Sequence, residues 1–98
     1  MIDAEVEKSP EQYTTALVEL ETLYPLPSTE AIRADCRWLQ ERWGSETLAQ
    51  YRGEHVAVFE GSVVGHGHNA LKLTLDLSRK LGLHPQRLVV AYVDPQEL

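Results

Sequence analysis

Hydrophobic positions recur every three or four residues in two N-terminal segments, and this spacing predicts two amphipathic helices. The first helix covers 10–24 and begins behind the capping residue Ser9. The proline-rich segment 25–27 ends it, because proline cannot continue a helix. A second helix then covers 29–43, and a short helical segment is expected at 46–51. The short loop favours an antiparallel hairpin of the two long helices.

After Tyr51 the pattern changes to one that favours strands. Two valine-rich segments, 55–59 and 62–66, flank Glu60-Gly61, and this spacing predicts a hairpin with a type I′ turn. In that register His55 lies opposite His66 on one face of the ribbon.

A helix and a strand complete the chain. Asn69 is a good helix cap and Gly82 a good stop, and the polar residues between them cluster within one arc of a helical wheel, so the sequence predicts a helix over 70–81. The segment 88–93 is continuously apolar and predicts a strand covered on both faces. Strand, helix, strand favours a right-handed crossover, with the last strand parallel to the second.

Together these elements predict an α+β fold for a single domain, 1–98. A helical part (9–50) is followed by a β-hairpin–helix–strand unit (51–95) with a small mixed sheet. Helix 70–81 covers one face of that sheet, and either the N-terminal helices or a second chain covers the other. Residues 2–7 alternate between apolar and acidic, a pattern that suits a half-buried strand as well as an acidic tail.

Charge and cysteine content narrow the class of partner. The chain has 98 residues and a net charge of −6, which disfavours nucleic acid as a partner. Strand, helix, helix at the N-terminus resembles the order in ribbon-helix-helix repressors, but Asp3, Glu5 and Glu7 would then face phosphates with the wrong charge. The single cysteine fits a reducing compartment, and no signal peptide or membrane span is evident, so we expect a cytoplasmic protein.

One resemblance covers roughly Leu48 to Pro95. Tyr51-Arg52-Gly53, the valine-rich hairpin, Gly67, the capped helix and the closing segment 90–95 resemble the small prokaryotic domain of unknown function numbered 5678. The resemblance implies the order hairpin, helix, strand. The family has no agreed catalytic residues, so no functional role is carried over. The chain departs from the family at 66–69, where a lysine and an aspartate would be more usual.

The histidines are the sharpest candidate for chemistry. His55, His66 and His68 would share one face of the predicted ribbon, and three imidazoles can hold Zn²⁺ with an open fourth position. The simpler interpretation is that histidines at the end of an edge strand are solvated, so we expect no cofactor and keep zinc as the alternative. The segment 65–68 precedes a helix, but it has neither the Walker spacing nor GxGxxG.

The aromatic residues and the cysteine favour packing or interaction over catalysis. Cys36 lies on the apolar stripe of the second helix and is best interpreted as a small buried hydrophobe. The residues assigned to interaction are aromatic: Trp38, Trp43, Phe59 and Tyr92.

These observations predict a small, acidic, non-enzymatic domain for protein interaction or regulation. The hairpin and the last strand are expected to leave at least one open sheet edge that accepts a partner strand, and we expect self-association as a dimer. The negative charge suits a basic partner, and an antitoxin-like or inhibitor-like role fits. The alternative is a metal or small-ligand site formed by the histidines.

Overall fold

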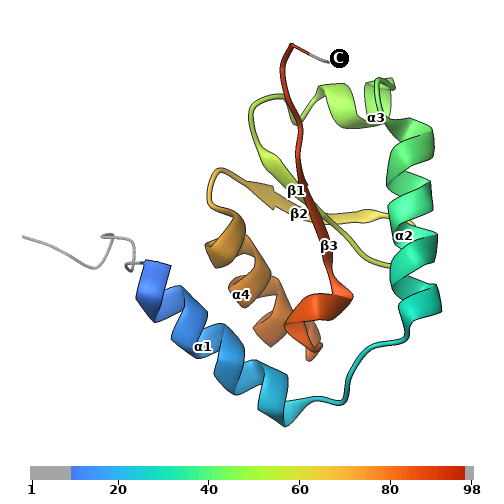
Figure 1. Cartoon of the computed structure of the whole chain (residues 1–98). Helices are drawn as coiled ribbons and strands as arrows, with labels where there is room; N and C mark the ends of the chain where they lie inside the picture. The colour runs from blue at the N-terminus through green and yellow to red at the C-terminus, as the bar shows by residue number, and fades with distance from the viewer. Residues whose placement is uncertain (1–9, 97–98) are drawn as a thin grey trace, which may run out of the picture.

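The structure is a computed structural model that describes residues 10–96. Residues 1–9 lie outside the described range, and with them the predicted cap Ser9 and the segment 2–7, for which the sequence left a strand and an acidic tail open. In chain order the elements are α1 (Pro10–Leu23), α2 (Thr29–Arg42), α3 (Glu46–Ala49), β1 (His55–Val58), β2 (Val63–Gly67), α4 (Ala70–Leu81), the 3₁₀ turn η1 (Pro85–Arg87) and β3 (Val89–Tyr92). The predicted α+β fold is confirmed (Figure 1).

Local sequence signals fix the helix ends. The Ser28 hydroxyl accepts a hydrogen bond from the backbone N–H of Ala31, 3.3 Å away, and so caps α2. Asn69 caps α4 through Lys72 N–H at 3.1 Å, and Gly82 ends α4 with a φ of 68°, a conformation that favours glycine. None of the helices within 10–96 is long and apolar enough to cross a membrane.

The sheet is antiparallel throughout. Its strand order is β2-β1-β3, and β1 pairs antiparallel with both neighbours. The predicted mixed sheet is therefore corrected in one respect: β2 and β3 run in the same direction, but β1 lies between them. The reason is that the connection through α4 carries the chain across β1, so that β3 adds to the far side of the hairpin.

The hairpin has the predicted turn but a different register. Glu60 and Gly61 both have positive φ, 52° and 72°, as a type I′ turn requires. Val58 pairs with Val63, but Ala57 pairs with Gly65, so Val64 is an extra residue that forms a β-bulge. The bulge shifts the rest of β2 by one residue and thereby moves each later side chain to the other sheet face.

The two long N-terminal helices lie on opposite sides of the sheet (Figure 1). One sheet face packs on α4 through Ala57, Leu77 and Leu88, and α1 packs on the outer side of α4 through Tyr13, Ala16, Leu20 and Leu75. The other face packs on α2 and α3 through Leu39, Leu48, Val56, Val58 and Val93.

The predicted antiparallel helical hairpin is therefore wrong. The segment between α1 and α2 is extended and contains Pro25 and Pro27, so it carries the chain from one side of the sheet to the other instead of folding it back. Helices α2 and α3 of the same chain cover the sheet face that α4 cannot reach.

Candidate functional site

Strand β3 is an edge of the sheet and carries no charged residue. The Val93 N–H donates to Glu54 O, 2.9 Å away, so the odd-numbered residues of β3 direct their backbone groups toward β1. Because these groups alternate along a strand, those of Val90 and Tyr92 point to the open side. The Tyr92 side chain is 47% exposed. An open edge of this kind is a template for another strand.

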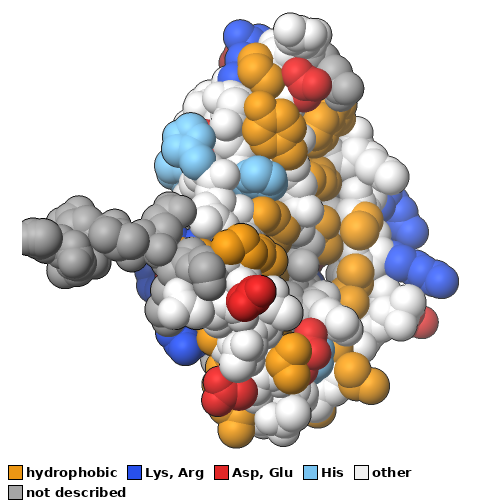
Figure 2. All heavy atoms as spheres, turned by 60° about the vertical axis from the view of Figure 1, so that its left-hand side comes forward, with side chains coloured by type: hydrophobic (Ala, Val, Ile, Leu, Met, Phe, Trp, Pro, Cys, Tyr) orange, Lys and Arg blue, Asp and Glu red, His pale blue; other side chains and the backbone are white. Residues whose placement is uncertain are grey.

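One buried polar atom lies beside Tyr92. His55 pairs with Tyr92 across β1 and β3, and their ring centroids are 5.2 Å apart. The Nδ1 atom of His55 is buried and has no hydrogen-bond partner among residues 10–96. Figure 2 shows hydrophobic side chains in a broken band from top to bottom of this view, with histidines beside its upper half.

A buried ion pair anchors the other end of the sheet. Asp35 of α2 is 3% exposed, and its Oδ2 lies 2.7 Å from a guanidinium nitrogen of Arg87. The same carboxylate accepts the backbone N–H groups of Glu60 and Gly61 at 3.0 and 2.8 Å. Asp35 therefore ties α2 to the hairpin turn and to the residues that precede β3. We call this group the Asp35 anchor.

The anchor holds Asp35 ionised. Burial by itself raises the pKa of Asp35, but the hydrogen bonds from Arg87, Gly61 and Glu60, with the Arg87 charge, lower the pKa below its usual value. The Arg87 guanidinium also stacks over the Phe59 ring, 4.6 Å from its centroid. The sequence pattern did not identify Asp35, because a carboxylate on a helix is usually solvated and these partners lie far away in sequence.

A cleft of about 380 Å³ opens beside this anchor. The extended linker forms one wall, and the hairpin turn and the segment after α4 form the others. His84 lines the cleft and is 5% exposed, and its Nδ1 accepts the backbone N–H of Gln86 at 3.1 Å. The residues that line the cleft include Tyr24, Pro25, Leu26, Phe59, Glu60, Leu83, His84 and Arg87.

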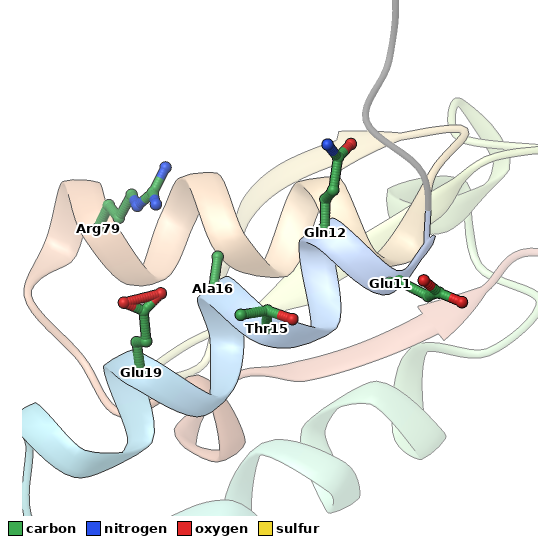
Figure 3. Close-up of a pocket in the computed structure, with 6 residues that line it drawn as sticks. All are labelled: Glu11, Gln12, Thr15, Ala16, Glu19 and Arg79. Carbon is green, nitrogen blue, oxygen red and sulfur yellow. The ribbon is translucent and has the colours of Figure 1, made fainter.

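Two further hollows contain fewer buried polar groups. A groove of about 460 Å³ lies between α1 and α4, where Glu19 and Arg79 extend from the two helices (Figure 3). All of its polar side chains are exposed. A smaller hollow of about 210 Å³ lies at the start of α4 and includes the exposed residues His66 and His68.

The structure does not bring the three candidate histidines onto one face. Because of the bulge, His55 pairs with Gly67 and His66 with Val56, so the predicted pairing of His55 with His66 is wrong. Instead the His66 Nδ1 lies 2.8 Å from a carboxylate oxygen of Glu54, and its ring lies 4.9 Å from that of Tyr51. Within 10–96, no three His, Cys, Asp or Glu side chains are grouped to hold a metal.

The four aromatic residues assigned to interaction do not form one surface. Trp38 and Trp43 pack half-buried against the α2–α3 side of the core, and Phe59 packs half-buried on the α4 side. Of the four, only Tyr92 is exposed, at 47%. Cys36 is half-buried on α2.

Comparisons with known protein families, with curated proteins and with solved structures return no match. The two features of the described residues that could bind a partner or ligand are the β3 edge and the cleft beside the Asp35 anchor.

Proposed function

We propose that this protein is a small non-enzymatic interaction domain that accepts an extended strand along the open edge of β3. The observation that carries the proposal is that edge itself: a regular strand without charge, with exposed Tyr92 and outward-facing backbone groups at Val90 and Tyr92. Backbone hydrogen bonds supply affinity in such pairing, and the side chains on alternate positions supply selectivity.

The partner strand that fits most directly is β3 of a second copy. In antiparallel pairing centred on Ala91, each Val90 lies opposite the second copy's Tyr92, and all four outward backbone groups of each strand are satisfied. A valine opposite an aromatic residue is a favourable cross-strand pair. A regulatory role follows from the same geometry, because a strand of a partner protein would compete with the second copy for β3.

The net charge of each copy opposes this pairing, so self-association should depend on salt concentration. Each copy carries a net charge of −6, so two copies repel one another at long range. The Debye length falls from about 30 Å at 0.01 M salt to about 8 Å at 0.15 M salt. Self-association through β3 should therefore strengthen as salt is added.

Light scattering of Tyr92→Lys tests the proposal. A lysine on the edge disfavours strand pairing, so we expect the wild-type mass to rise above 11.1 kDa with concentration and the variant to stay at that mass. Val18→Lys is the matched control, because Val18 is 52% exposed on α1, away from β3. A wild type that stays at the monomer mass at high concentration and moderate salt, or a Tyr92→Lys variant that associates equally well, would contradict the proposal.

A further inference from the structure

We propose that the cleft beside the Asp35 anchor binds a small neutral molecule with an apolar body and one carbonyl or amide oxygen. This site is separate from the β3 edge and does not depend on strand pairing. Its volume of about 380 Å³ lies within the range of small-ligand pockets.

The donor for the ligand oxygen is His84. Its Nδ1 accepts the Gln86 N–H, which places the ring proton on Nε2 in the neutral imidazole. Within 10–96, no hydrogen bond joins that Nε2 to a protein acceptor, although the residue is 95% buried (5% exposed) and lines the cleft. A mostly buried imidazole that lines a cleft and carries a ring N–H donor favours a ligand that brings an acceptor.

The walls select an apolar body. The linker contributes Tyr24, Pro25 and Leu26, and the opposite side contributes Phe59 and Leu83. Leu26 is 81% exposed at the rim and gains most if a ligand covers it.

The charges select a neutral ligand over an anion. Arg87 lines the cleft, but its guanidinium is already paired with Asp35 at 2.7 Å. Glu60 also lines the cleft and is exposed at the hairpin turn, so it adds a negative charge that no cation in the cleft is left to balance. A carboxylate ligand would meet this charge, whereas an amide oxygen accepts from His84 without repulsion.

The proposal is tested with two probes of the same shape, phenylacetamide and phenylacetate, by following backbone amide shifts in ¹⁵N-labelled protein. A fragment of this size is expected to bind with a Kd on the order of millimolar. We expect phenylacetamide to bind more tightly than phenylacetate and to shift signals of 24–27, 59–60 and 82–87. Shifts confined to other parts of the chain, no saturable shift, or tighter binding of phenylacetate would overturn the proposal.

Three variants assign the roles. His84→Asn keeps an acceptor for the Gln86 N–H, because asparagine side chains bond two residues ahead, but it removes the Nε2 donor; we expect phenylacetamide to bind about two- to tenfold more weakly. Glu60→Gln should reduce the preference for the amide over the acid. Leu26→Ser should weaken both probes equally, and because Leu26 is exposed this variant keeps the test decisive if His84→Asn fails to fold. Unchanged binding in both His84→Asn and Leu26→Ser would also overturn the proposal.

Discussion

The two edges of the sheet differ in how well they are protected against another strand. Strand β2 carries a bulge at Val64, two glycines and the exposed His66, which lies against Glu54. Strand β3 has a regular register with β1, no charge and no glycine. Bulges and charged side chains are the devices by which proteins blunt an edge. The contrast indicates that the fold discourages pairing at β2 and leaves it available at β3.

The Asp35 anchor holds segments next to both edge strands. The Asp35 anchor holds the turn that joins β1 to β2, and through Arg87 it holds the residues that lead into β3. Both edges are therefore positioned by a single carboxylate on a helix outside the sheet.

The largest expected effect comes from removing that support. Asp35→Ala leaves Arg87, whose side chain is 12% exposed, without its partner and leaves two turn N–H groups unsatisfied. We expect the free energy of unfolding to fall by about 3–5 kcal/mol, measured by urea denaturation. The control is Asp76→Ala, an exposed aspartate on α4, with an expected change within about 0.5 kcal/mol.

The same anchor predicts a pH dependence. Because the pKa of Asp35 is lowered in the folded protein, its contribution is fully present above the ordinary value of 3.8 and is lost as the pH falls through the folded value. Asp35→Asn should lack this part of the acid transition. Equal acid sensitivity of the wild type and Asp35→Asn would contradict the role of the anchor.

A smaller effect is expected within β2. A Cβ atom at Gly65 would lie 2.7 Å from Leu77 Cδ1 and 3.2 Å from Leu73 Cδ1, so glycine lets α4 approach the sheet closely. Gly65→Val should lower the free energy of unfolding by about 1–3 kcal/mol, because the leucines must shift to make room. Gly67→Val in the same strand is the control, since its Cβ would meet nothing within 4 Å. Thermal or urea denaturation of both variants gives the comparison, and equal losses would mean that close packing at Gly65 is not the cause.

The smallest effect on self-association is expected for a substitution on the β2 edge, and this variant tests whether β2 or β3 is the pairing edge. His66→Lys places a lysine on the β2 edge, near the carboxylate of Glu54. We expect its mass by light scattering to match the wild type at every concentration, while Tyr92→Lys stays at the monomer mass. A loss of association in His66→Lys would mean that β2, and not β3, is the pairing edge.

The sequence predicted the helix ends and the hairpin turn correctly where the signals lie within a few residues of one another. Asn69 and Gly82 bound α4 as predicted, and Glu60-Gly61 forms the expected turn, because capping and turn chemistry act within a few residues. The bulge at Val64 was not predicted, since the same valines fit a regular ladder equally well. It arises where Gly65 packs under Leu77, a contact that the spacing of residues in β2 does not reveal.

The way in which the helices pack around the sheet could not be predicted from the hydrophobic pattern, because it too depends on contacts between residues that are remote in sequence. The proline-rich linker marks the end of α1, but its extended path across the sheet depends on where α4 and β3 pack. In the sequence Asp35 is typical of a carboxylate on a solvated helix face. Its structural role depends on the hydrogen bonds from Gly61 and Arg87, which are remote in sequence. The cleft at His84 is likewise built from segments that are remote in sequence.

The link between Asp35 and Arg87 also bears on the order in which the chain assembles. The two residues are 52 positions apart, so their contact closes a long loop, whereas α1, α2, the hairpin and α4 are each built from near neighbours. Contacts between distant residues form slowly because the loop must first lose its freedom. We therefore expect this pair to form late in folding, after the helix, the turn and the approach to the last strand have reached their places.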